Sequence, residues 1–257
     1  MSTTPRILRP TGAGRYVLLC DHASNIVPEE LDGLGLAPSD LARHIGWDIG
    51  AAGITALLSE MLDAPAVLSA VSRLVIDCNR HPGAADLIPA ISDGTRIPGN
   101  QSLNEADRAA RIHAWFTPYH DAVESVLQAR ESSAAVPTTI VSVHTMTPSL
   151  NGVPRPWQIA VSSAADRSLA DPLLAALKQP GDVEVGDNQP YDLDAAVDFS
   201  VPFHAWRRGW PHVQVEFRQD EVADAAGQLL WARRFAQALM DLPIPASEPV
   251  AFARHVQ

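Results

Sequence analysis

Histidine and glutamate side chains stand at or near the ends of three strongly apolar segments. The side chains are His22, His144 and Glu216, and the segments are Tyr16–Cys20, Thr138–Val143 and His212–Phe217. In open α/β sheets, ligands bind beyond the carboxyl ends of the strands, so residues from distant parts of the chain can converge there. Neutral imidazole is a good zinc ligand, and a hydrolytic zinc site has three protein ligands, one water and a nearby carboxylate that can act as base. The pattern therefore predicts metal chemistry at one edge of a sheet.

A third metal ligand has two candidates. Asp48 lies in an apolar, glycine-containing segment, where an acidic group is costly to bury unless it is paired or bound to a metal. Asn25 lies three residues after His22 and could reach the same point. Asp21, next to His22, is better suited to hydrogen-bond a metal ligand than to bind the metal itself, or to cap the following turn. The alternatives are that Asp48 is a solvated helix residue and that the histidines are hydrogen-bonded residues at the edge of a core.

The apolar run at 73–78 begins with Arg73 and is followed by Asn79 and Arg80. Arginine binds planar carboxylates through two parallel hydrogen bonds, so Asn79 and Arg80 offer donors for a carboxylate of the substrate. This composition predicts a small acidic substrate. The alternative for Arg73 is a salt bridge with Asp77 or Asp48.

Two further side chains are candidates for binding the substrate. Tyr191 ends the turn-rich segment 185–191, whose composition suits a flap that closes over a ligand. Arg218 follows Glu216 by two positions, so both side chains lie on the same face of a regular strand. The alternative for the flap is an ordinary surface loop.

Apolar runs and helical patterns alternate along the chain. Strands are expected at 16–20, 66–71, 73–78, 138–143, 157–161 and 212–217, and helices at 39–62, 103–130, 166–177 and 220–242. Several strands are too continuously apolar to have one face in water, which indicates an α/β sandwich with a covered sheet. The second and third strands are too close for a helical crossover, so an antiparallel pair and hence a mixed sheet is expected. Pro118 is expected to kink or divide the second helix.

The acidic composition argues against some classes of function. Asp and Glu number 30 against 19 Lys and Arg, and the net charge of −11 would repel a phosphate backbone, so no nucleic-acid partner is expected. No apolar run approaches the ~20 residues that cross a bilayer, and no signal-peptide pattern is present. We therefore expect a cytoplasmic protein with no membrane partner, folded as a single domain over residues 1–257. The sequence is compatible with a homo-oligomer.

Several motifs, in order along the chain, resemble the N-formylglutamate amidohydrolase family. They are Asp21-His22-Ala-Ser-Asn25-Ile-Val-Pro28, Gly46-Trp-Asp48-Ile-Gly50, Ser72-Arg73-Leu-Val-Ile-Asp77-Cys-Asn79-Arg80, Val143-His144-Thr, Asp187-Asn-Gln-Pro-Tyr191 and Val213-Gln-Val-Glu216-Phe-Arg218-Gln-Asp220. The resemblance implies a three-layer α/β/α sandwich with a mixed central sheet, similar to that of zinc carboxypeptidases and aspartoacylase, which is a phosphorylase/hydrolase-like fold. It also implies a zinc-dependent amidohydrolase that acts on linear amide bonds.

The resemblance implies one zinc ion, bound by His22, Asp48 and His144, with Glu216 in the place of the carboxypeptidase general base. One departure from the pattern concerns this site. Carboxypeptidases and aspartoacylase carry a His-x-x-Glu pair, whereas this sequence has Asn25 where the glutamate would stand. Asp48 is therefore the expected replacement for the second ligand.

The arginines and their neighbours are implied to bind a small acidic N-acyl amino acid. Arg73 would stabilise the oxyanion, Asn79 with Arg80 would bind one carboxylate, and Tyr191 or Arg218 would bind the other. The expected reaction converts N-formyl-L-glutamate to formate and L-glutamate. One alternative is a zinc amidase, deacylase or carboxypeptidase-like enzyme that acts on another N-acyl amino acid or a small peptide. The other is a metal-free protein that binds a small acidic ligand.

Overall fold

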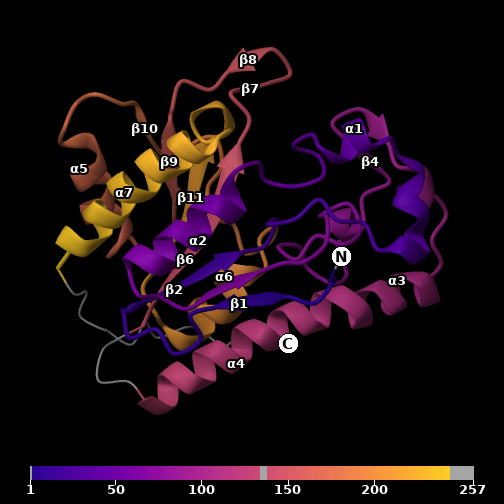
Figure 1. The fold of residues 1–257 in the computed structure, drawn as a ribbon, viewed down its shortest axis with the longest axis horizontal. Helices are drawn as coiled ribbons and strands as arrows, with labels where there is room; N and C mark the ends of the chain where they lie inside the picture. The colour runs from indigo at the N-terminus through magenta and orange to yellow at the C-terminus, as the bar shows by residue number, and fades with distance from the viewer. Residues whose placement is uncertain (1, 134–137, 244–257) are drawn as a thin grey trace.

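A seven-stranded sheet with the order β1-β3-β2-β6-β11-β9-β10 forms the centre of the protein (Figure 1). The computed structural model describes residues 2–133 and 138–243. The strands are β1 (Arg6–Leu8), β2 (Tyr16–Cys20), β3 (Ala66–Leu68), β6 (Thr139–Met146), β9 (Ile159–Ser162), β10 (Val185–Asp187) and β11 (His212–Arg218). The pairs β1 with β3 and β9 with β11 are antiparallel, and the other four neighbouring pairs are parallel. The predicted α/β fold with a mixed central sheet is confirmed.

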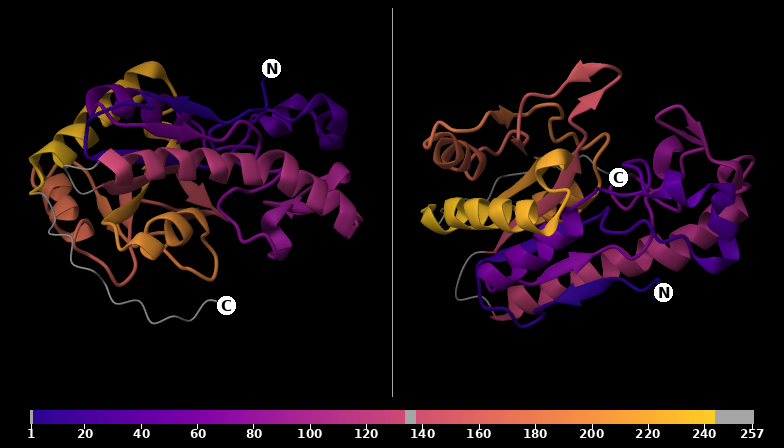
Figure 2. Two further views of the ribbon diagram at one scale, coloured as in Figure 1. Left: turned by 90° about the horizontal axis from the view of Figure 1, so that it is seen from below. Right: turned by 45° about the horizontal axis from the view of Figure 1, so that its top comes forward.

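Helices cover both faces of this sheet, as expected for a three-layer sandwich (Figure 2). The helices α2 (Ala51–Met61), α5 (Ala170–Lys178) and α7 (Ala225–Asp241) pack on one face. The helices α4 (Thr117–Ser133) and α6 (Ser200–His204) pack on the other. Alternate residues of β2 face the two layers, since Leu18 contacts the first group and Leu19 the second. Among the residues that the structure describes, no helix has the length and apolar character needed to cross a membrane, and the cytoplasmic location stays a prediction.

Short elements outside the sheet lie toward the ends of its strands. They are α1 (Pro38–Leu41), α3 (Glu105–Arg111), the hairpin of β4 (Ile91–Ser92) with β5 (Thr95–Arg96), and the hairpin of β7 (Ser149–Leu150) with β8 (Val153–Pro154). The β7–β8 hairpin projects beyond the sheet at the top of the view in Figure 1. It follows β6 directly, so it extends the carboxyl end of a central strand.

The strands β2, β6 and β11 are neighbours in the middle of the sheet and run parallel. Every residue of β2 and β6 is buried, as is all of β11 except its last residue. Burial on both faces explains why these three segments read as continuous apolar runs. Their parallel direction brings their carboxyl ends to a single edge of the sheet.

The strand predicted at 73–78 is wrong. The segment forms turns, and its apolar side chains, including Leu74, Val75 and Ile76, are buried in a separate cluster rather than in the sheet. Ser72 accounts for the turn, because its hydroxyl accepts a hydrogen bond from the Leu74 N–H (3.2 Å) and its carbonyl accepts one from the Val75 N–H (2.8 Å). These local bonds replace the ladder of a strand. The antiparallel partner of β3 is therefore β1.

The helix expected over 39–62 is divided into α1 and α2 by a series of turns that contains Asp48. Gly50 precedes α2 with a φ of 88°, a left-handed conformation that strains other residues. A Cβ atom at this position would lie 2.5 Å from the Val222 carbonyl oxygen. The turn therefore requires glycine, and it brings Asp48 out of the helix toward the sheet edge.

The division expected at Pro118 takes the form of a π-helical turn rather than a break in the helix. The helices α3 and α4 are joined without a break by a π-helical turn over Ile112–Phe116. Proline lacks an N–H and its ring clashes with the carbonyl four residues earlier in a regular α-helix. A π turn just before Pro118 widens the helix at that carbonyl, so the chain continues to Ser133.

His212, the first residue of β11, is a buried histidine whose partners suit the neutral ring. Its Nδ1–H donates to the Trp210 carbonyl (2.8 Å), and its Nε2 accepts from the indole N–H of Trp206. A proton on Nε2 would face the indole N–H. Burial lowers the pKa of His212 below 6.5.

We expect the free energy of unfolding to fall as the pH drops below about 6.5. In that range the unfolded chain takes up a proton at His212 that the folded protein does not, which favours the unfolded state by up to ~1.4 kcal/mol per pH unit. Urea unfolding at pH 7.5 and 5.5 measures the loss. His212→Gln should reduce it, and His113→Gln, at an exposed position, should leave it unchanged. An undiminished loss in His212→Gln would contradict this origin.

Candidate functional site

Three polar side chains meet at the carboxyl ends of the central strands. His22 lies in the turn after β2, His144 lies near the end of β6, and Glu216 lies near the end of β11. The backbone register places Glu216 directly opposite His144. All three are buried, with at most 5% of each residue exposed. The structure thus brings together the residues that the strand ends predicted.

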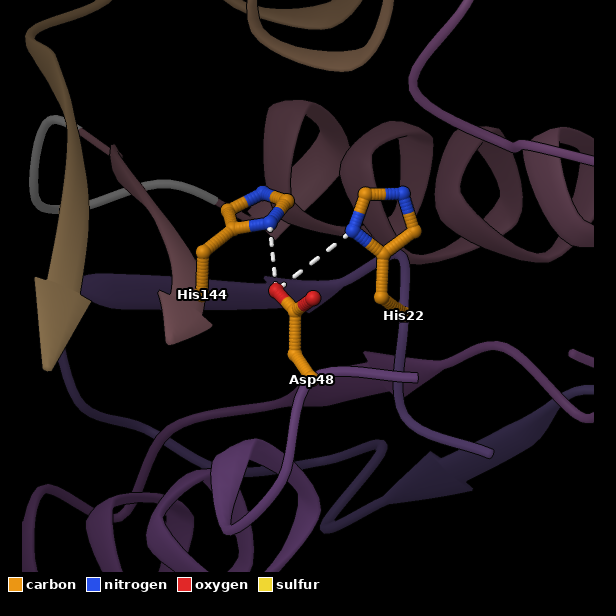
Figure 3. Close-up of side chains that lie close together, drawn as sticks. All are labelled: His22, Asp48 and His144. Carbon is orange, nitrogen blue, oxygen red and sulfur yellow. Dashed lines mark hydrogen bonds and ion pairs between the residues drawn. The ribbon is translucent and has the colours of Figure 1, made fainter. Parts of the chain in front are cut away.

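The imidazoles of His22 and His144 face a common carboxylate (Figure 3). Their ring centroids are 5.0 Å apart. Asp48 Oδ2 lies 3.0 Å from His144 Nδ1 and 3.4 Å from His22 Nδ1. The Asp48 backbone N–H donates to the His22 carbonyl (3.0 Å), which ties the turn before α2 to the turn after β2. Asn25, the other predicted candidate, lines a separate surface hollow.

The second nitrogen of each imidazole is held by an acidic or hydroxyl group. His22 Nε2 lies 2.7 Å from Asp77 Oδ1. His144 Nε2 lies 3.0 Å from Ser142 Oγ and 3.4 Å from Asp21 Oδ2. Carboxylates behind histidine ligands fix the ring orientation and raise the basicity of the ring in metalloproteins. Both Nδ1 atoms are thereby left facing Asp48.

The donor set fits a divalent cation such as zinc. One donor atom from each of His22, Asp48 and His144 lies within 4.8 Å of the others. His22 Nδ1 is buried and makes no hydrogen bond of good geometry, and the charged atom that it faces is Asp48 Oδ2 at 3.4 Å. Two imidazoles with one carboxylate form a common protein ligand set for zinc.

Burial and neighbouring charges set the protonation of these groups. Burial alone would raise the pKa of Asp48, but His22 and His144 hold it well below its usual range. Burial would lower the pKa of His144, but Asp21 and Asp48 raise it well above 6.5. The carboxylates therefore draw protons onto the imidazoles, and a bound cation would replace those protons. Burial raises the pKa of Glu216 to about 7, well above that of an ordinary glutamate.

A cavity of about 340 Å³ opens over these residues. This volume is in the range of small-molecule sites. Arg73 lines the cavity and forms ion pairs with Asp77 (2.8 Å) and Asp48 (3.3 Å). The two salt bridges considered as alternatives from the sequence are therefore both present, and they coexist with a position in the cavity wall.

Of the four residues predicted to bind substrate, three line the cavity and one does not. Asn79 lines the cavity, but its side chain is occupied by Asp198 and by the N–H groups of residues 199 and 200. Arg80 and Tyr191 also line it. Arg218 does not line the cavity, because its guanidinium pairs with acidic residues 220 and 221 and donates to the carbonyls of residues 155 and 156.

Gln214 and Arg155 are polar cavity residues that were not found from the sequence. Gln214 precedes Glu216 by two positions in β11, so the period of a strand places both on one face, and this signal could have revealed it. Its Oε1 atom is buried without a partner. Arg155 lies in an irregular segment between β8 and β9, where no strand or helix periodicity predicts the direction of its side chain.

Comparisons with known proteins agree with this architecture. The family model for N-formylglutamate amidohydrolase matches residues 14–223. A crystallised gene product of Agrobacterium tumefaciens is 33% identical, with a TM-score of 0.87 over 93% of this chain and 96% of that chain. A crystallised N-formylglutamate amidohydrolase from Ralstonia eutropha is 18% identical, with a TM-score of 0.69 over 92% of this chain and 96% of that chain, and it shares the fold. No curated protein matches the sequence.

Proposed function

Since this chain belongs to the N-formylglutamate amidohydrolase family, we propose that it hydrolyses N-formyl-L-glutamate to formate and L-glutamate with a zinc ion held by His22, Asp48 and His144. The observation that carries the proposal is the buried cluster in which one donor atom from each of these three residues lies within 4.8 Å of the others. Two imidazole nitrogens and a carboxylate oxygen that converge in a buried site suit a divalent cation.

Glu216 is proposed to move the proton in this reaction. A zinc ion, when bound, would act as a Lewis acid that polarises the amide carbonyl and makes water more acidic. The carboxylate of Glu216 accepts a proton from water as its oxygen attacks the formyl carbon, and it returns a proton to the amine as the C–N bond breaks. Burial brings the pKa of Glu216 to about 7, close to the value suited to a group that both accepts and donates near neutral pH.

Arg73 is proposed to stabilise the oxyanion that forms on the substrate carbonyl. Its guanidinium is fixed by two carboxylates and its side chain is 26% exposed toward the cavity. A donor held in place before the reaction stabilises developing charge without reorganisation.

We expect Arg73→Ala to lower formate release by about 10²–10³-fold. The cation content should not fall, since the substitution removes a positive charge next to Asp48. Arg73→Lys keeps the charge but loses the planar pair of donors, so its activity should lie between that of the wild type and that of Arg73→Ala. Steady-state formate release and elemental analysis on the same preparations measure both effects. Wild-type turnover in Arg73→Ala would remove Arg73 from the mechanism.

Metal content and formate release together test the whole proposal. The protein is chelated, reloaded with zinc and assayed with N-formyl-L-glutamate and with a panel of other N-formyl and N-acyl amino acids. About one equivalent of zinc and preferred release of formate from the glutamate derivative are expected. A preference for another acyl group would contradict the proposed substrate but not the proposed mechanism. The alternative of a metal-free binding protein predicts less than ~0.1 equivalent of zinc. It also predicts that a chelator does not change the affinity for acidic ligands. Both results together would contradict the proposed enzyme.

A further inference from the structure

Arg155 is a buried guanidinium that lines the cavity without an acidic partner. Only 7% of the residue is exposed. Its Nη1 donates to the Thr147 carbonyl (3.4 Å) and hydroxyl (3.1 Å), and its Nη2 donates to the Tyr191 hydroxyl (2.6 Å). Within residues 2–133 and 138–243, no carboxylate forms an ion pair with it. A buried charge of this kind is costly unless an anion joins it.

The other two arginines of the cavity wall are already paired. Arg73 is held between Asp48 and Asp77. Arg80 pairs with Asp86 (2.9 Å). Because a guanidinium has five N–H donors and the Arg155 side chain makes three described hydrogen bonds, Arg155 has donors left for a ligand.

The chain fixes Arg155 from several sides. Its N–H donates to the Pro148 carbonyl (2.8 Å), and its carbonyl accepts from Arg218 Nη1 (3.2 Å). Its guanidinium carbon lies 5.1 Å from the centre of the Tyr191 ring. A donor that is ordered before the ligand arrives loses less entropy on binding. Arg218, expected from the sequence to touch substrate, is thus placed to act through the backbone of Arg155.

We propose that Arg155 binds one of the two carboxylates of a dicarboxylic N-acyl amino acid, an assignment that rests on the proposed function and specifies its substrate class. Arginine recognises a planar carboxylate with paired hydrogen bonds. Arg80 can bind the other carboxylate through Nη2, because its pair with Asp86 uses Nε and its bond to the Asn79 carbonyl uses Nη1. Asp192 and Asp194 line the same cavity, so a ligand anion is favoured only beside the arginines.

Calorimetric titration of the zinc-loaded protein tests this assignment. The titrations use a Glu216→Gln background so that the ligand survives the measurement. The ligands are N-formyl-L-glutamate, its side-chain amide N-formyl-L-glutamine and its α-amide N-formyl-L-isoglutamine. Arg155→Met removes the charge at similar volume, Arg155→Lys keeps the charge, and Arg233→Met changes an exposed arginine of α7 as the control. Thermal melting establishes that each variant is folded.

Arg155→Met should raise the Kd for the diacid by about 10- to 100-fold, and Arg233→Met should not change it. The loss should disappear for one of the two amides, which identifies the carboxylate that Arg155 binds. An unchanged Kd for the diacid, or an equal loss with all three ligands, would overturn the assignment. If Arg155→Met does not fold, Arg155→Lys is used instead. It loses the paired donors of arginine, so it should raise the Kd for the diacid and not that for one of the two amides.

The two proposals fail in different ways. A starting protein that does not bind the diacid at all overturns both the proposed substrate and the role of Arg155. Binding that depends on Arg155, combined with an absence of formate release from the protein with Glu216 intact, overturns only the hydrolysis. Formate release without any effect of Arg155 on affinity overturns only the role of Arg155.

Discussion

Replacing Glu216 with glutamine is expected to lower formate release by about 10²–10⁴-fold, the usual contribution of a general base. Glutamine has nearly the same shape as glutamate but cannot accept the proton of the attacking water. Glu216 is buried opposite His144 in the sheet and is not one of the three clustered metal-binding candidates. The variant should therefore keep its fold and its zinc. Steady-state formate release and elemental analysis of the same sample measure the two properties.

The control for this substitution is Glu60→Gln, an exposed glutamate near the C-terminal end of α2 that does not line the cavity. It should release formate at the wild-type rate. A Glu216→Gln protein that is fully active would show that another group takes the proton. Simultaneous loss of zinc and activity would instead make Glu216 a ligand, and the proton acceptor would have to be sought elsewhere in the cavity.

Replacing His144 with alanine is expected to abolish zinc retention and, with it, detectable formate release. His144 Nδ1 lies 3.0 Å from Asp48, and its other nitrogen is held by Ser142 and Asp21. Loss of a group behind a metal ligand typically weakens metal affinity 10–100-fold, so loss of the ligand itself should cost at least about 100-fold. Competition with a chromophoric chelator measures the affinity, and His113→Ala, at an exposed position, is the control.

A second variant separates a ligand role from a structural one. Removal of His144 also takes one buried partner from each of Asp21 and Asp48, which lowers stability in its own right. Asp48→Asn keeps the volume of the side chain while removing its charge, and it should also weaken zinc binding. Folded variants of both positions that bind zinc as tightly as the wild type would contradict the proposed metal site.

The position of the reacting groups was predictable from the sequence because it depends on the central strands. The apolar runs that end near His22, His144 and Glu216 are apolar because helices cover both faces of the sheet. Parallel neighbouring strands with both faces buried have their carboxyl ends at one edge of the sheet. Polar residues at those ends therefore lie together at that edge. The mixed sheet was expected from a different pair, because the antiparallel partner of β3 is β1 and not the segment 73–78.

The irregular segments were not predictable in this way. The run 73–78 has the apolar composition of a strand, but Ser72 bonds to its own neighbours and the run packs into a second cluster. Arg155 has no periodicity around it, and its direction is set by Pro148, Thr147 and Tyr191, which lie in other segments. Contacts of this kind depend on the folded chain, and a single sequence carries no local sign of them.

The strand residues of the proposed catalytic site and the residues proposed to bind the carboxylate belong to different kinds of element. His144 and Glu216 belong to buried strands, whereas Arg155 and Tyr191 belong to connecting loops. Loops tolerate insertion and exchange far better than core strands do. If the proposed roles hold, relatives of this protein can change the amino acid they recognise by remodelling these two loops, while the strand residues stay the same. Grafting those loops between relatives is the corresponding route to a redesigned specificity.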